Sequence, residues 1–300
     1  MLLVHPSCLA SRKIVALGAM TALAALVACS EPPPAKAEPK IDAGVTNPAD
    51  SPPNPEVRKA LFAEFQPVAL SNCQFERIGG KSDGGYLACG NLLASARAGY
   101  SYGIAHTDDW GCQVSARLKA PVHQYDCFDT KVPVCRGGTT VFHAECVGPT
   151  KFTEEGRLFD TVQAQIAKNG DNGKRLIVKM DVEGAEWASL LATPDAVLTD
   201  IDQLVLEFHH VDQPLNVDSI RKLRRFFHLV NIHYNNHACA PNVAPFPAWA
   251  FQVLLVNKKV GVLAPAGTIA RVPNPLDEPD DPSQPDCQAE PAVTESKSTR

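Results

Sequence analysis

Three carboxylates follow an apolar, strand-like run in the middle of this 300-residue chain. The run covers residues 175–180, and Asp181, Glu183 and Glu186 come directly after it. In open α/β sheets, ligands bind in the crevice beyond the carboxyl ends of the strands, so these acids are candidates for holding a ligand. Gly184 allows the backbone to turn sharply there. The alternative interpretation is an ordinary helix N-terminus, where acidic side chains suit the helix macrodipole.

The segment around these acids resembles a known family. Lys179–Trp187, KMDVEGAEW, is similar to the K-(I/M)-D-x-E-G-x-E signature of FkbM-type and methyltransferase-like domains, which belong to the S-adenosylmethionine (SAM) Rossmann class. Arg77–Tyr86 resembles the R-x-G-x-x-x-D-G-G-Y segment of that family. Tyr100–Ile104, followed by Asp108–Trp110, resembles its first loop. The resemblance covers about residues 73–257.

The resemblance implies a SAM site at the ends of the first strands. The residues that it implies as cofactor ligands are Tyr102, Gly103, Asp108, Asp126 and Asp181. An acid after the second strand of such a sheet accepts hydrogen bonds from the ribose hydroxyls, and Asp126 ends the run 122–125. Asp129 competes with Asp126, because the usual D-P-T of the family is absent here. The chain also lacks a G-x-G-x-G loop, so a phosphate-binding role has no support.

Methyl transfer to a hydroxyl group needs a base that takes the hydroxyl proton. The resemblance places Asp181 beside the methionine end of the cofactor or the substrate, with Glu183 and Glu186 near the acceptor. The candidate catalytic residues are therefore Asp181, Glu183 and His209, which follows the apolar run 203–208. A single histidine at a strand exit is otherwise a structural residue.

Several metal-ligating residue types also cluster in the second half of the chain. The set consists of His209, His210, His233, His237 and Cys239, together with Asp181 and Glu183. Imidazole and carboxylate groups suit several divalent ions, but this spacing matches no diagnostic metal motif. We interpret these residues as polar loop residues and predict no metal site.

The hydrophobic pattern predicts an α/β fold. Strand-like runs cover residues 100–105, 121–125, 139–143, 175–180, 203–208, 229–233 and 248–256. Helical patterns separate several runs: Phe159, Val162 and Ile166 share one predicted helix, and a second lies between Asp218 and Phe227. This alternation predicts a doubly wound, mainly parallel sheet, Rossmann-like as in the SAM methyltransferases. The link 237–247 lacks helical periodicity, so the last two strands are expected to form an antiparallel hairpin.

The two ends of the chain differ from its centre. Arg12 and Lys13 precede an apolar run, residues 14–28, that is too short to span a bilayer and is typical of a signal peptide. Residues 26–29, LVAC, resemble a bacterial lipobox, which implies lipidation of Cys29; plain signal cleavage is the alternative. Residues 29–56 are predicted to be a Pro-rich tether, and residues 264–300 a disordered acidic tail. Residues 57–263 remain for the methyltransferase-like domain.

Charge and cysteine usage narrow the function classes. Removing residues 1–28 removes two positive charges and changes the formal net charge from −5 to −7, which does not suit nucleic acid. Beyond Cys8 and Cys29, eight cysteines remain, and an even number in an exported chain predicts disulfides. We expect at least two bridges among Cys73, Cys89, Cys112, Cys127, Cys135 and Cys146.

The sequence therefore predicts an exported, lipid-anchored, SAM-dependent methyltransferase. Its partners would be the membrane, through the lipid, and a small-molecule or glycan-like acceptor that is methylated on oxygen. Because SAM is made in the cytoplasm, an exported domain would meet little of it. Two alternatives therefore remain: a non-catalytic ligand-binding lipoprotein on the same fold, and a metal-dependent hydrolase that uses Asp181, Glu183 and the histidines.

Overall fold

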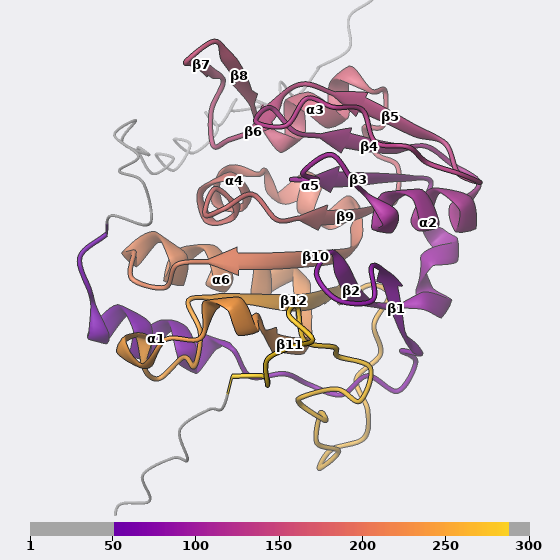
Figure 1. Ribbon diagram of the computed structural model, residues 1–300. Helices are drawn as coiled ribbons and strands as arrows, with labels where there is room; N and C mark the ends of the chain where they lie inside the picture. The colour runs from indigo at the N-terminus through magenta and orange to yellow at the C-terminus, as the bar shows by residue number, and fades with distance from the viewer. Residues whose placement is uncertain (1–50, 288–300) are drawn as a thin grey trace, which may run out of the picture. The chain divides into compact units, whose positions relative to one another are not determined.

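The computed structural model describes residues 51–287 (Figure 1). The predicted signal peptide, Cys29, most of the predicted tether and residues 288–300 lie outside this range. Among the described residues, none of the helices has the length and apolar character needed to cross a membrane.

A seven-stranded sheet forms the centre of the fold, and its strands follow one another in Figure 1. From one edge to the other they are β11 (Phe227–Tyr234), β12 (Ala250–Asn257), β10 (Ile201–His209), β9 (Leu176–Met180), β3 (Ala98–Tyr102), β4 (Val122–Tyr125) and β5 (Thr140–His143). Each of the seven predicted runs overlaps one of these strands, so the predicted α/β sheet is confirmed.

The sheet is mixed but mostly parallel. β3 pairs in parallel with β4 and β9, β4 with β5, and β9 with β10. β12 is antiparallel to both of its neighbours, β10 and β11, which confirms the predicted C-terminal hairpin. Numbered along the chain, the seven strands have the order 3-2-1-4-5-7-6. The order therefore reverses between β3 and β9, and such a switch point opens a crevice at the carboxyl ends of the strands.

Different elements cover the two faces of the sheet. One face packs against α3 (Val162–Lys168), α4 (Glu186–Ala192), α5 (Asp195–Asp200) and α6 (Pro214–Phe226), with α1 (Pro55–Glu64) against α6. The other face packs against α2 (Asp109–Leu118), the 3₁₀ helix η2 (Gly90–Ser95) and the hairpin of β1 (Phe75–Gly79) and β2 (Gly85–Cys89).

The smaller elements include one difference from the predicted helices. A three-stranded sheet contains β6 (Cys146–Val147), β7 (Phe152–Glu154) and β8 (Arg157–Asp160), and two 3₁₀ turns, η3 (Asn236–Ala238) and η4 (Pro241–Val243), lie before β12. Phe159 belongs to β8, where its ring stacks on Phe152 at 4.4 Å, so its assignment to a helix with Val162 was wrong. Thr161 begins the helix instead, because its side chain accepts a hydrogen bond from Ala164 N.

Disulfides join all eight cysteines of the described residues. The pairs are Cys73–Cys89, Cys112–Cys135, Cys127–Cys146 and Cys239–Cys287. Three bridges connect the six cysteines that were expected to contribute at least two, so the prediction is confirmed. Such bridges are typical of oxidising, extracytoplasmic compartments.

The predicted disordered tail is folded as far as Cys287. Asn231 Nδ2 donates to Asp277 at 3.0 Å, and Gln252 Nε2 donates to Asp280 at 3.0 Å, so the segment after residue 263 lies against β11 and β12. Asp280 is buried, and the Cys239–Cys287 bridge secures the end of the segment. Its composition suggested disorder because it is acidic, rich in proline and nearly free of aromatic residues, but hydrogen bonds and a disulfide hold it instead. The domain therefore extends beyond the predicted boundary at residue 263.

This attachment gives the first testable prediction. Replacing both Cys239 and Cys287 with serine should lower the free energy of unfolding by about 2–4 kcal/mol, because the unfolded chain loses a cross-link. Chemical denaturation measures this change. Limited proteolysis should then cut the segment after residue 263 in the double variant but not in the parent protein. Equal protease resistance of the two proteins would contradict a tail held by this bridge.

Candidate functional site

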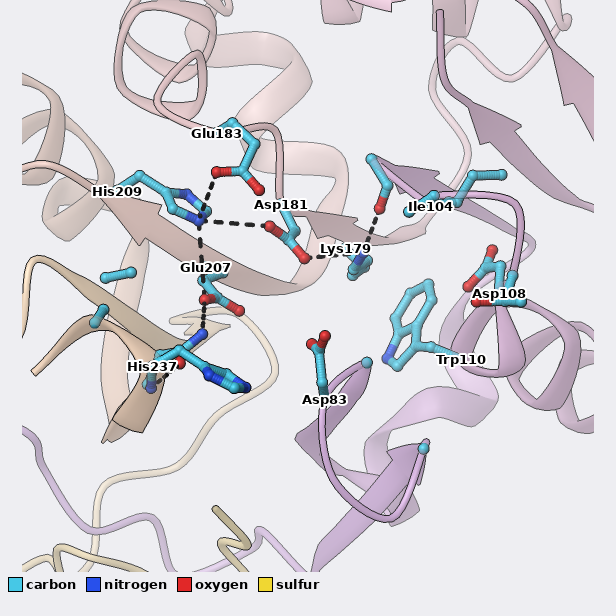
Figure 2. Close-up of a pocket in the computed structure, with 18 of the residues that line it drawn as sticks. Asp83, Ile104, Asp108, Trp110, Lys179, Asp181, Glu183, Glu207, His209 and His237 are labelled. Carbon is cyan, nitrogen blue, oxygen red and sulfur yellow. Dashed lines mark hydrogen bonds and ion pairs between the residues drawn. The ribbon is translucent and has the colours of Figure 1, made fainter. Parts of the chain in front are cut away.

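A cavity of about 310 Å³ opens at the carboxyl ends of β3, β9 and β10, where the strand order reverses. Figure 2 shows the charged side chains that face it. Of the residues predicted from the sequence, the cavity is lined by Gly103, Asp108, Asp181, Glu183 and His209. The predicted crevice and most of the predicted residues therefore coincide in space.

Strand alternation places four polar side chains on the same side of the sheet. Lys179 and Asp181 alternate with the buried Met180, and Glu207 and His209 alternate with the buried Phe208. Met180 pairs with Leu206 in the parallel register, so Asp181 and Glu207, the next residues, lie side by side.

The turn after β9 is built around Glu186. Its carboxylate accepts hydrogen bonds from Val182 N at 2.6 Å and Gly184 N at 3.0 Å, and the residue is fully buried. Glu183 has a φ of 55° and Gly184 a φ of 108°, which is the sharp turn expected from the glycine. The resemblance placed Glu186 near the acceptor, but the structure turns its carboxylate into the turn and away from the cavity lining.

His209 lies at the exit of β10 between four carboxylates. Its Nδ1 lies 3.1 Å from Glu186 Oε1, and its Nε2 lies 3.6 Å from Glu183 Oε2 and 3.8 Å from both Asp181 Oδ1 and Glu207 Oε1. Burial lowers the pKa of this imidazole, but the surrounding carboxylates, Glu186 foremost, outweigh burial and raise the pKa to about 10. His209 is therefore a cation at neutral pH.

Glu207 is a site residue that the sequence reasoning missed. Burial, followed by the neighbouring Asp181 charge, raises the pKa of its carboxyl to about 8, and Asn235 Nδ2 donates to its Oε1 at 2.7 Å. Its position two residues before His209 on a strand was the available signal, because residues i and i+2 share one side of a sheet.

Tyr86 and Lys179 hold Asp181 in place. The Tyr86 hydroxyl donates to Asp181 Oδ2 at 2.7 Å, and Lys179 Nζ lies 3.5 Å from the same oxygen. Lys179 Nζ also donates to Gly103 O at 2.5 Å, which ties β9 to the first loop. Both residues belong to the segments that carry the family resemblance, although the sequence reasoning gave them no role.

The first loop, which connects β3 to α2, packs against the turn after β9 and against Asp126. Gly103 has a φ of 71°, and a Cβ at this position would lie 1.6 Å from Asp181 O, so glycine permits a close approach of two backbone segments. Asp126 Oδ2 accepts from Ile104 N at 3.0 Å and Ala105 N at 3.1 Å. Its Oδ1 accepts from the amides of residues 128 and 129, at 2.9 and 3.0 Å.

These four hydrogen bonds fill the acceptor capacity of the Asp126 carboxylate. Neither Asp126 nor Tyr102 is among the residues that line the cavity, and Tyr102 is fully buried. Asp129 instead pairs with His106 at 2.8 Å. Asp108 does line the cavity, but its side chain accepts from Gly111 N at 2.7 Å as the N-cap of α2. The proposed role of Asp126 as a ribose ligand stays a prediction that requires the first loop to open.

Trp110 contributes a hydrogen-bond donor to the cavity wall. The indole is 1% exposed, and its Nε1 has no hydrogen-bond partner among the described residues. In Figure 2 the indole nitrogen points toward the space between Asp83 and Lys179. A buried N–H without a partner costs free energy, so a ligand that offers an acceptor here would remove that cost.

The cavity carries an excess of negative charge. Its lining includes the carboxylates of Asp83, Asp108, Asp109, Asp181 and Glu183, together with Glu207, whose raised pKa of about 8 keeps it mostly protonated at neutral pH. Lys179 and His209 are the cations that oppose them. A cavity with this charge pattern attracts positively charged ligands.

The other metal-ligating residues found in the sequence are dispersed. Cys239 is in a disulfide, His233 lies 3.4 Å from Asp286 under the tail, and His210 stacks on Trp249 at 5.5 Å. Within the described residues, the set with atoms close enough to share an ion contains Asp181, Glu186 and His209.

In comparisons with protein-family models, curated proteins and solved structures, nothing matches this chain. Its function is therefore inferred from its own residues.

The charge state of His209 predicts how stability depends on pH. A free imidazole has a pKa of about 6.5, so the stabilisation by the carboxylates is complete below that pH and is lost as the pH rises toward about 10. Ionisation of Glu207 adds to the loss, because its pKa is also raised. The melting temperature should therefore fall between about pH 6.5 and 9.5.

Circular dichroism melts of two variants test this interpretation. His209→Gln should flatten the decrease. His210→Gln is the matched control and should leave it unchanged, because burial lowers the pKa of His210 and places its titration below this range. Equal slopes in the two variants would show that His209 is not the titrating group.

Proposed function

We propose that this chain is a SAM-dependent methyltransferase that methylates a hydroxyl group of a small or glycan-like acceptor. The observation that carries the proposal is the position of Asp181. It ends the fourth strand of a 3-2-1-4-5-7-6 sheet, contacts the first loop and faces an acidic cavity at the switch point. The sequence around it has the KMDVEGAEW pattern, so fold and motif support the same family of functions.

The charges that line the cavity support binding of one end of SAM. SAM supplies a methyl group on a positively charged sulfur and carries an amino and a carboxylate group at the same end. The carboxylate of Asp181 suits the positive groups, and Trp110 Nε1 offers a donor to a ligand carboxylate. Lys179 contacts Gly103 O and Asp181, so we assign it the role of holding the first loop in position rather than of binding SAM.

The adenosine end requires the first loop to move. Asp126 can accept from a ribose only if the amides of Ile104 and Ala105 release it. The backbone of this loop is strained, since Ala105 has a φ of 39° and His106 a φ of 61°. Left-handed conformations of such residues cost about 1–2 kcal/mol each, which lowers the free energy needed for opening.

The acceptor hydroxyl must lose a proton within the carboxylate cluster. His209 is positively charged, so it is suited to stabilising a developing oxyanion rather than to accepting the proton. Glu183 has a side chain that is 82% exposed at the cavity rim and lies 3.6 Å from His209 Nε2. We assign the base to Glu183 and the orientation of the acceptor to Asp181 and His209.

The same proposal includes export and lipid attachment at Cys29. Four disulfides support an oxidising compartment, and the signal-like run and the lipobox-like LVAC support attachment to a membrane.

A second candidate function is ligand binding without methyl transfer. It is favoured by the closed first loop, in which Asp126 already has all its hydrogen-bond partners. In that case the acidic cavity alone would bind a cationic ligand.

Isothermal titration with SAM separates the two functions. The purified protein should bind SAM, and Asp126→Asn should weaken binding by about tenfold or more, because charge-assisted hydrogen bonds contribute about 1.5–3 kcal/mol. Asp129→Asn is the matched control and should have no effect. Undetectable SAM binding at millimolar ligand would favour the binding function, and a loss confined to Asp129→Asn would move the ribose site to Asp129.

Turnover should depend on Glu183 more than affinity does. With radiolabelled SAM and an extract of the native cell envelope as acceptor, Glu183→Gln should lower methyl transfer by about 100-fold, since loss of a base acts mainly on the transition state. SAM affinity should change little. Unchanged turnover in Glu183→Gln would remove the assignment of the base.

Lipid attachment is tested by Cys29→Ala in the native host. The substitution should move the protein from the membrane fraction to the soluble exported fraction, because the acylated residue is lost. Mass spectrometry of the native protein should find a lipid on Cys29 as the first residue. An unmodified N-terminus at Met1 would contradict both export and attachment.

A further inference from the structure

The segment between β4 and β5 exposes large apolar side chains close together. Within residues 127–136, Phe128, Val132 and Val134 are between 63% and 82% exposed. A single exposed apolar side chain is ordinary on a protein surface, whereas several neighbouring ones mark a surface that binds something. Each of these side chains would gain free energy on leaving water, so a partner that covers them would be stabilised on this surface.

The 127–136 segment is held by its own cross-links. Disulfides attach it at two points, Cys127 to β6 and Cys135 to α2. The Asp126 carboxylate accepts hydrogen bonds from two amides of the segment at 2.9 and 3.0 Å. Pro133, between the two valines, is buried. These attachments oppose a collapse of the apolar side chains onto the core, so their exposure is a feature of the fold.

Basic side chains accompany the exposed apolar ones. Lys131 and Arg136 are exposed within the segment, and the Arg157 guanidinium lies 4.2 Å from the centre of the Phe128 ring. The single acid of the segment, Asp129, is paired with a histidine of the first loop at 2.8 Å. The segment is therefore basic although the whole chain has a formal net charge of −5. Apolar side chains flanked by lysine and arginine suit the surface of a bilayer with anionic headgroups.

We propose that the 127–136 segment docks the domain on an anionic lipid bilayer. Its three exposed apolar side chains enter the headgroup layer, and its two basic side chains contact lipid phosphates. This surface lies outside the cavity and takes no part in methyl transfer, so the inference goes beyond the proposed reaction.

The choice of a bilayer as the partner rests on the lipid attachment at Cys29 that is proposed above. Fewer than thirty residues separate Cys29 from α1, and such a chain spans at most about 90 Å even when it is fully extended. A domain tethered within that distance meets the bilayer at a high effective concentration. A docking surface of low intrinsic affinity is then sufficient.

The docking segment adjoins the first loop. Asp126 Oδ1 accepts from the segment, while its Oδ2 accepts from Ile104 N and Ala105 N, which belong to the lining of the cavity. Asp129 pairs with His106 of the same loop. Docking would therefore bring the first loop, and the cavity wall that it forms, close to the membrane surface.

Vesicle cosedimentation tests the proposal on residues 30–300, which contain the described fold, residues 51–287, but neither the signal-like run nor Cys29. This protein should bind phosphatidylglycerol vesicles more tightly than phosphatidylcholine vesicles. Binding should weaken as the salt concentration rises, because salt screens the attraction to anionic headgroups. No binding to phosphatidylglycerol vesicles at millimolar lipid, or equal binding to the two lipids, would overturn the proposal. Because Cys29 is absent, either result would leave the lipid attachment to its own test.

A first pair of variants locates the apolar part of the surface. Val132→Ser combined with Val134→Ser should weaken binding to phosphatidylglycerol vesicles by about tenfold or more, because two side chains no longer leave water. Val262→Ser combined with Ile269→Ser is the matched control. These two exposed apolar residues follow β12, near the opposite edge of the sheet from β5 (Figure 1), and their replacement should have no effect. Equal losses in the two double variants would refute the assigned surface.

A second pair tests the basic side chains. Lys131→Gln combined with Arg136→Gln should weaken binding by about tenfold or more and remove most of the salt dependence. Lys258→Gln combined with Lys259→Gln removes two exposed charges directly after β12 and should change neither quantity. A salt dependence that is lost only in the second double variant would place the lipid contact elsewhere.

A second copy of this chain is the other occupant that such a surface could have. Light scattering without vesicles should give the same molecular mass for the parent protein and for the Val132→Ser, Val134→Ser variant. A dimer that only this variant loses would assign the surface to contact between copies and would overturn docking on a bilayer.

Discussion

The site depends on one buried carboxylate, that of Glu186. It accepts hydrogen bonds from two amides of the turn after β9 and lies 3.1 Å from His209 Nδ1 at the exit of β10. A buried carboxylate without such partners would be costly, so each partner stabilises the others. Through this residue the turn that presents Asp181 and Glu183 is joined to the strand that presents Glu207 and His209. The cluster is therefore ordered before any ligand binds.

The cluster also has an unbalanced charge, and that imbalance decides what the cavity can bind. Three carboxylates surround His209 Nε2, and further acids line the remaining wall. Burial, followed by the Asp181 charge, raises the pKa of Glu207, and the surrounding carboxylates hold a proton on His209. A proton is the smallest cation that relieves this repulsion. A sulfonium group would do the same, so the charge of this cluster supports the proposed function.

The sequence predicted the sheet well because its signals are local. All seven strand runs, the final hairpin and the position of Asp181 follow from hydrophobic runs and from the residues that end them. The missed features depend on contacts between distant residues. The strand alternation with His209 indicates which side of the sheet Glu207 faces, but its position beside Asp181 depends on the parallel register between β9 and β10, and the hydrogen bonds of Asp126 are to the amides of the first loop. Residues 264–287 fold because of polar side chains on β11 and β12, which composition alone does not reveal.

The closed first loop bears on how an exported domain could use SAM. If the competent state requires Asp126 to leave the amides of residues 104 and 105, the apparent affinity is the intrinsic affinity multiplied by the open fraction. A compartment with little SAM would then leave the adenosine side closed most of the time. The cluster around His209 is not subject to this cost, because Glu186 already orders it. The two sides of the crevice therefore differ. The side at Asp126 needs a conformational change of the first loop before it can bind a ribose, whereas the side at His209 already has the arrangement that attracts a cation.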